Sequence, residues 1–103
     1  MSDVIVVRKG QKPSGYTVVY IGRPSVFGNP FSMRSESERI EVIAKHRAWL
    51  NDMRKEQKPQ WTAVVKLAAR VKAGEKLALE CYCAPRKCHG DTIAAAIAMI
   101  NSD

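Results

Sequence analysis

Four side chains that can act as nucleophiles, bases or metal ligands lie close together near the end of the chain. They form the pattern C-x-C-x4-C-H, made by Cys81, Cys83, Cys88 and His89. Zinc binds four sulfur or nitrogen ligands, so this set could serve a zinc-stabilised interaction module. However, adjacent residues such as Cys88 and His89 rarely point at one ion, and the sequence has no second C-x-x-C pair. We therefore expect no metal and no other cofactor, and keep zinc as a minor alternative.

A reactive thiol is the second interpretation of the same segment. Cys88 precedes an expected helix, whose unpaired backbone N–H groups and dipole stabilise an anion. His89 is adjacent, and Arg86 and Lys87 add positive charge. These conditions lower the pKa of a cysteine, so Cys88 and His89 are candidate catalytic residues. Cys81 is expected to be an ordinary buried strand residue.

The third interpretation is a phosphate site without a nucleophile. The helix expected to begin at Asp91 can bind phosphate through its backbone N–H groups, with Gly90 permitting close approach. Arg23, which follows an earlier strand, could clamp the same phosphate with its planar guanidinium. Asp91 or His89 would then be the acid–base residue. An aspartate in this position is more often a helix cap, and that alternative stays open for Asp91.

The loop GRPSVFGNPF, residues 22–31, is rich in glycine and proline but too apolar for a purely solvated segment. Such a loop is usually shaped around a ligand or around the neighbouring core. Its candidate binding residues are Gly22, Arg23 and Asn29. The alternative is a rigid corner, in which Asn29 only bonds its own backbone.

Residue patterns predict the elements that position these groups. Strands are expected at residues 3–8, 17–21 and 77–83. Ser35 and Glu38 have the spacing of a capping box and predict a helix that Pro59 closes. A second helix is expected over residues 60–72 and a last one over 92–100, with Asp91 as its N-cap and with burial nearly all round. The apolar positions expected to be buried in the two earlier helices are Ile40, Ile43, Trp49, Leu50 and Met53, then Trp61, Val64, Val65, Ala68 and Val71. His46 is expected to be a boundary residue without function.

The order of these elements predicts an α/β fold of the form β-β-α-α-β-α. The short link between the first two strands favours an antiparallel hairpin, and the two-helix crossover places the second and third strands parallel, which gives a small three-stranded mixed sheet. Ligands of parallel α/β sheets bind beyond the carboxyl ends of the strands. The two irregular loops leave such ends, so Arg23 and Cys88 should face one concavity.

Length and composition indicate one globular domain over residues 1–103. Apolar residues make up 46% of the chain and charged residues 26%, which is not a disordered composition. No apolar run is long enough to span a bilayer, the start is not a signal peptide, and the clustered cysteines suit a reducing compartment, so a cytoplasmic protein is expected. The net charge of +7 favours a polyanionic partner, although the basic residues are dispersed.

Over nearly its whole length the sequence resembles a domain-of-unknown-function family of phage and bacterial genomes, numbered four-three-two-six. The matching pieces are YIGRPSVFGNPF, the charged helix containing HRAWL, and LALECYCAPRKCHGDTIA. Tyr82 stands where tryptophan is common in that family. The resemblance implies a phage or prophage origin, hence a host cytoplasm, and no known reaction. It also implies a shared pocket built from Arg23, Asn29, Cys83, Cys88, His89 and Asp91.

Together these observations predict a protein that binds, and in one version transforms, a phosphorylated small molecule such as a nucleotide or nucleotide sugar. Arg23 and the start of the last helix would hold the phosphate, while Cys88 or His89 would act on the remainder. The alternatives are a non-enzymatic binder of nucleic acid or of a host protein, and the zinc-stabilised module. The sequence leaves open whether the protein is an enzyme.

Overall fold

The computed structural model describes residues 3–83 and 86–102, and its centre is a three-stranded sheet. The strands are β1 (Val4–Arg8), β2 (Thr17–Tyr20) and β3 (Leu77–Cys81). β3, the last strand in the sequence, lies in the middle and pairs in parallel with both neighbours. The α/β class and the parallel pairing of β2 with β3 are as predicted, but the sheet is all parallel and not mixed.

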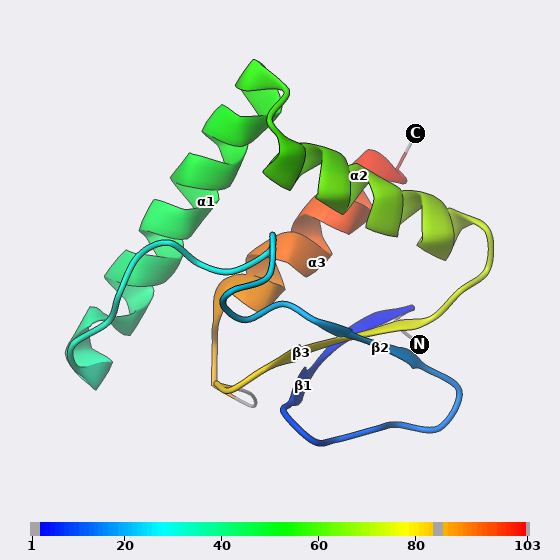
Figure 1. Ribbon diagram of the computed structural model, residues 1–103, viewed down its shortest axis with the longest axis horizontal. Helices are drawn as coiled ribbons and strands as arrows, with labels where there is room; N and C mark the ends of the chain where they lie inside the picture. Colours follow the sequence, from blue (N-terminus) through cyan, green and yellow to red (C-terminus); the bar gives the residue numbers. More distant parts are fainter. Residues whose placement is uncertain (1–2, 84–85, 103) are drawn as a thin grey trace.

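The predicted hairpin between β1 and β2 is wrong because these two strands do not touch. β3 is buried along its whole length and takes one neighbour at each edge. The connection of residues 9–16 returns along the sheet to the start of β2, on the face opposite the helices (Figure 1). It is held there by hydrogen bonds from the backbone N–H of Lys9 to the Cys81 carbonyl, 2.8 Å, and from that of Gly10 to the Glu80 carboxylate, 3.0 Å. A short link therefore replaces the helix usual between parallel strands.

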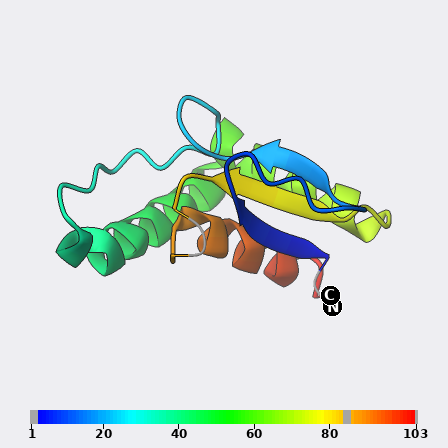
Figure 2. The same ribbon diagram turned by 90° about the horizontal axis from the view of Figure 1, so that it is seen from below.

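Three helices lie on the other side of the sheet: α1 (Arg39–Glu56), α2 (Pro59–Lys72) and α3 (His89–Ile100) (Figures 1 and 2). α3 packs against β1 and β3, and α1 packs against α2 and α3. Side chains at alternate positions of β3 point into this layer, as expected for a strand. The core joins Leu77, Leu79 and Cys81 of β3 to buried residues of all three helices, to Ile21 after β2 and to Cys88 before α3. The helix residues are Leu50, Trp61, Val64, Leu67, Ala68, Ile93 and Ile97. No helix in the described part of the chain is long and apolar enough to cross a membrane.

The start of α1 differs from the predicted capping box. Ser35 makes no capping hydrogen bond; its hydroxyl lies 2.8 Å from the Ser37 hydroxyl instead. A short 3-10 turn, Glu36–Glu38, precedes the α-helix, which begins at Arg39. The Glu36 carboxylate accepts hydrogen bonds from the Arg39 guanidinium, so an ion pair spans this turn.

The buried face of α1 is rotated from the predicted one. Ile40 is 77% exposed, whereas Val42, His46 and Leu50 are buried and recur every four residues. His46, expected at a boundary, is only 1% exposed. In α2 the same kind of shift leaves Val65 exposed and buries Leu67. A helix needs only one stripe against its neighbours, and both helices carry more apolar residues than that stripe holds.

The helix boundaries around Pro59 and Asp91 also move. α1 ends at Glu56, where Gln57 takes a left-handed conformation (φ 55°), and Pro59 opens α2 instead of closing α1. The N-cap of α3 is Cys88 and not Asp91, which occupies the third helical position. The far end of α3 is less buried than predicted, with Met99 53% exposed.

Candidate functional site

A cavity of about 290 Å³ opens at the carboxyl end of the sheet, where the 22–31 loop meets the segment that follows β3. It contains most of the residues singled out from the sequence: Gly22, Arg23, Asn29, Cys83, Cys88 and His89. The predicted meeting of Arg23 and Cys88 in one concavity is therefore observed. Its other walls are Phe31, Met33, Arg39, Val42, Ile43, Cys81 and Tyr82.

The first wall is the 22–31 loop, which is folded into two successive turns. The backbone N–H of Ser25 donates to the Gly22 carbonyl and that of Gly28 to the Ser25 carbonyl, both at 2.9 Å. A side chain at position 22 would overlap the Tyr20 ring, and one at position 28 would come within 2.9 Å of Cγ of Arg23. Glycine at both positions thus lets the loop close tightly around Arg23.

Arg23 and Asn29 present hydrogen-bond donors from this loop. No hydrogen bond or ion pair joins the Arg23 guanidinium to another described residue. The Asn29 side-chain oxygen accepts from the Phe31 backbone N–H at 2.9 Å, which is the corner interaction considered above. Its amide nitrogen has no hydrogen-bond partner within residues 3–83 and 86–102, so the same side chain can shape the corner and donate to a ligand.

Arg39, at the start of α1, supplies a second guanidinium that sequence reasoning missed. It donates to the Glu36 carboxylate at 2.6 and 2.8 Å and to the Lys87 carbonyl at 2.9 Å. Hydrogen bonds to Glu36 and then to Cys83 raise its pKa further above the usual arginine value. Glu36 also binds Arg86, and its own pKa is lowered chiefly by the hydrogen bond from Arg39. The Glu-x-x-Arg spacing of residues 36–39 was the available signal.

The Cys88 thiol does not have the lowered pKa that the sequence predicts. It is 3% exposed, and its sulfur lies 3.0 Å from that of Cys81. The hydrogen bond to Cys81 and burial raise its pKa, and they outweigh the opposing hydrogen bond from the Gly90 backbone N–H at 3.3 Å. Helix termini favour a thiolate, but burial in an apolar setting disfavours the charge more strongly here. Cys88 is therefore a neutral thiol that caps α3.

Cys83 is the half-buried thiol of the three, and it lines the same cavity as the Arg39 guanidinium, whose pKa it helps to raise. It lines the cavity beyond the end of β3. Among the cysteines it is thus the one that combines access to a ligand with a neighbouring positive charge, the two features of a reactive thiol.

His89 lies between the cavity and the core. Its Nε2 is 2.7 Å from the Ile21 carbonyl oxygen, and because a carbonyl oxygen can only accept, Nε2 carries the proton. In the neutral form of the ring, Nδ1 is then the unprotonated nitrogen and can act as a base. Behind it the His46 ring makes an edge contact, with ring centroids 5.2 Å apart.

His46 is held neutral by its surroundings. Burial, and then the charge of His89, lower the pKa of His46 to about 4. Its Nδ1 has no hydrogen-bond partner among the described residues. The four-residue spacing of Val42, His46 and Leu50 would have placed this histidine on the buried face of the helix.

Gly90 and Asp91 lie outside this cavity. Gly90 is buried against the sheet, where an added side chain would come within 2.9 Å of Cδ1 of Ile21. The absence of a side chain at Gly90 therefore lets the helix pack closely on the core, and does not serve the approach of a phosphate. The Asp91 carboxylate accepts from the Cys88 backbone N–H at 3.1 Å and completes a capping box. That is the helix-cap alternative, with the aspartate at the third position and not at the cap itself.

The zinc alternative finds no support in the positions of its ligands. Among the described residues, which include Cys81, Cys83, Cys88 and His89, no three cysteine, histidine or acidic side chains group as metal ligands do. The hydrogen bond of His89 to the Ile21 carbonyl also occupies the nitrogen nearest the sheet.

Comparison with known protein families matches residues 5–99 to the family described as Domain of unknown function (DUF4326). Because the match covers nearly the whole chain, the protein belongs to this family. No curated protein and no solved structure is significantly similar to it.

Proposed function

We propose that this member of the DUF4326 family binds a phosphorylated small molecule, a nucleotide or nucleotide sugar, in the cavity at the carboxyl end of its sheet. The observation that carries the proposal is the Arg23 guanidinium, which lines the cavity without a described hydrogen-bond or ion-pair partner. No carboxylate is among the described residues that line it. A concave site with an unpaired guanidinium and no acidic wall favours an anion.

The phosphate would lie between Arg23 and Asn29. A guanidinium offers two parallel N–H donors that match two phosphate oxygens, and the Asn29 amide nitrogen adds a third donor. Arg39 adds a second guanidinium from the start of α1, and its bonds to Glu36 and the Lys87 carbonyl fix its position. In this arrangement the helix terminus of α3 is not the phosphate cradle, because Gly90 packs against the sheet.

The remaining walls suit the apolar part of such a ligand. Phe31, Met33, Val42 and Ile43 are apolar, and Tyr82, 66% exposed, stands beside them. Planar bases stack on aromatic rings and fit between aliphatic side chains. The cavity volume, about 290 Å³, is at the low end of the range of small-molecule sites, about 300–1,000 Å³, so we favour a ligand with one base over a dinucleotide.

A reaction on the bound molecule, if the protein is an enzyme, would fall to His89 and Cys83. The unprotonated Nδ1 of His89 supplies a base, and the Cys83 thiol is the accessible sulfur in the cavity. Cys88 is not proposed as the reacting thiol because its pKa is raised. The proposal retains the cytoplasmic, phage-associated setting predicted from the sequence, in which such thiols stay reduced.

Calorimetric titration with nucleoside monophosphates, nucleotide sugars and the matching nucleosides tests the proposal. We expect the phosphorylated compounds to bind more tightly than the nucleosides, and Arg23→Ala to weaken binding by about tenfold to a hundredfold, the value of a charged hydrogen bond. Arg23→Lys should lose part of this affinity because lysine lacks the two parallel N–H donors of the guanidinium.

The control is Lys66→Ala, which removes an exposed cation on α2 that does not line the cavity. It should bind as the wild type does, and all variants should keep the wild-type melting temperature because exposed charges contribute little to folding. Equal binding by wild type and Arg23→Ala, or no preference for phosphate, would refute the proposal.

A further inference from the structure

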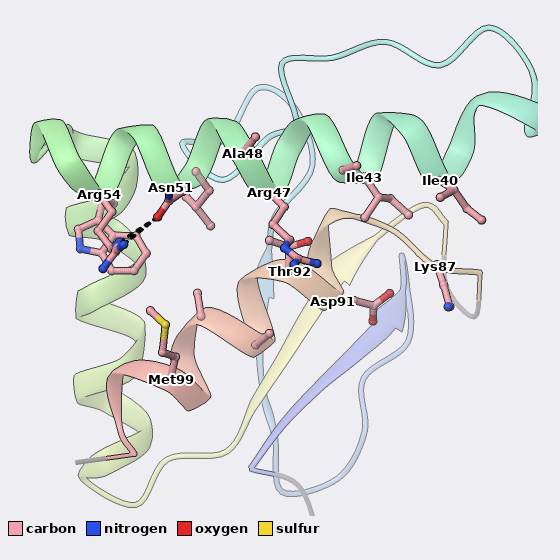
Figure 3. Close-up of a pocket in the computed structure, with 15 residues that line it drawn as sticks. Ile40, Ile43, Arg47, Ala48, Asn51, Arg54, Lys87, Asp91, Thr92 and Met99 are labelled. Atoms are coloured by element: carbon pink, nitrogen blue, oxygen red, sulfur yellow. Dashed lines mark hydrogen bonds between the residues drawn. The ribbon is translucent and has the colours of Figure 1, made fainter.

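A second and larger hollow, the α1–α3 groove, lies between α1 and α3 (Figure 3). Its volume is about 930 Å³, and its floor includes Leu50 and Trp61 of the core. Small side chains line it, Ala44 and Ala48 from α1 and Ala95 and Ala96 from α3. Only Ile43 is shared with the cavity described above.

The groove leaves large apolar side chains in water. Ile40 on α1 is 77% exposed and Met99 on α3 is 53% exposed. Figure 3 shows Ile40 near one end of the groove and Met99 near the other, with Ile43 between α1 and the start of α3. Isolated exposed apolar residues are ordinary, but several of them around one concavity mark an interaction surface.

The charged residues of the groove are mainly basic. Arg47, Arg54 and Lys87 line it, and no described carboxylate forms an ion pair with any of them. Arg54 is turned along α1 to the Asn51 side chain, 2.9 Å away, and Arg47 points across towards α3 (Figure 3). The one acidic residue of the lining, Asp91, is occupied in the α3 cap. The chain as a whole carries +7.

From this combination we propose that the groove binds an acidic amphipathic helix of a partner protein. The apolar stripe of such a helix would cover Ile40 and Met99, and the alanines would let its backbone come close to α1 and α3. Its glutamates or aspartates would face Arg47, Arg54 and Lys87. The inference is independent of the proposed ligand in the other cavity.

The same features disfavour two other occupants. A second copy of this chain would bring two like-charged grooves together, and like charges across an interface cost affinity. A nucleic acid would set phosphates against the basic residues but would leave Ile40 and Met99 without apolar contacts, since its affinity comes chiefly from phosphate neutralisation.

Selection from a displayed library of helical peptides, with both apolar and charged positions randomised, tests the proposal on the full chain. We expect enriched peptides with one apolar stripe flanked by acidic residues. Synthetic copies, titrated by fluorescence anisotropy, should bind about tenfold more weakly to Ile40→Glu and to Met99→Glu, both of which place a carboxylate at an exposed position.

Val65→Glu is the matched control, because Val65 is exposed on α2 and does not line the groove. Its affinity should stay within about twofold of the wild type, and circular dichroism should show all three variants folded. Arg47→Glu should weaken acidic peptides further and raise affinity for copies with lysine in place of glutamate. Enrichment of basic or uncharged peptides, no enrichment, equal binding by the variants, or dimerisation of the chain through this face in sedimentation would overturn the proposal.

Discussion

At the scale of single residues, the three thiols differ in chemistry although they lie within eight positions of the sequence. Cys81 and Cys88 are 2% and 3% exposed and contact each other, while Cys83 is half-buried in the cavity wall beside Arg39. A thiol reacts as its thiolate and must be reached by the reagent. The pattern C-x-C-x4-C-H therefore contains one accessible cysteine and two core cysteines.

We expect N-ethylmaleimide to modify Cys83 first in the native protein. Cys81 and Cys88 should react at least about a hundredfold more slowly, because their reaction requires a transient opening of the core. Peptide mass spectrometry after timed quenching measures the three rates, and Cys83→Ser provides the control in which fast labelling disappears. Labelling of Cys88 as fast as that of Cys83 would contradict the burial described above.

The pH dependence of stability should carry the signature of His46. Its folded pKa is about 4, below the ordinary value of about 6.5, so between these values the unfolded chain binds a proton that the folded protein does not. The contribution of His46 to the free energy of unfolding is fully present above about pH 6.5. It is lost as the pH drops towards about 4, by up to about 3 kcal/mol.

Urea unfolding at pH 7 and pH 4.5 measures this effect. His46→Leu, which keeps an apolar side chain at the buried position, should lose less stability between the two pH values than the wild type does. Identical losses would show that other groups, such as the carboxylate of Glu36 with its lowered pKa, cause the acid sensitivity.

At the scale of elements, the start of α3 distinguishes the two roles considered for Asp91, a helix cap and an acid–base residue of the site. Its carboxylate completes the capping box with Cys88 and lies outside the proposed ligand cavity. Asp91→Ala should therefore lower the free energy of unfolding by about 1 kcal/mol and leave ligand affinity unchanged.

The comparison variant is Asp52→Ala, which removes an exposed carboxylate of α1 that has no described hydrogen-bond or ion-pair partner and should change stability little. Denaturant unfolding and calorimetry on the same samples separate the two roles. If Asp91→Ala lost ligand binding and kept its stability, Asp91 would be a residue of the ligand site and not a helix cap.

How far the elements could be predicted depended on the kind of signal. β-branched residues located β1 and β2, and glycine and proline located the loops, because these residues restrict the backbone directly. β3 has no β-branched residue and was predicted from its apolar composition. Capping residues were harder to predict. Ser35 and Glu38 have the spacing of a capping box, but neither side chain makes a capping hydrogen bond. The sequence of α1 contains two candidate apolar stripes, and only the packing partners decide which of them is buried.

At the scale of the whole molecule, the site was more predictable than the sheet that carries it. The two-helix crossover fixed β2 parallel to β3, which was enough to bring the 22–31 loop and Cys88 to one edge. The position of β1 did not follow, because a short connection favours a hairpin locally, whereas the buried β3 gains two paired edges.

The two hollows differ in the chemistry of their lining residues. The smaller one lies at the end of the sheet with Arg23, Asn29 and His89, and the larger one lies between α1 and α3 with exposed apolar residues. Ile43 lines both hollows. A ligand in one and a helix in the other would therefore share a wall.

The central place of β3 sets a condition on biosynthesis. Every strand pairing of the sheet involves residues 77–81, so a nascent chain that has reached only residue 76 carries β1 and β2 without a partner for either. The ribosome must translate and release this late segment from its exit tunnel before any of the sheet can assemble. The sheet therefore assembles only after β3 has emerged, and until then the two earlier strands remain open to pairing with other chains.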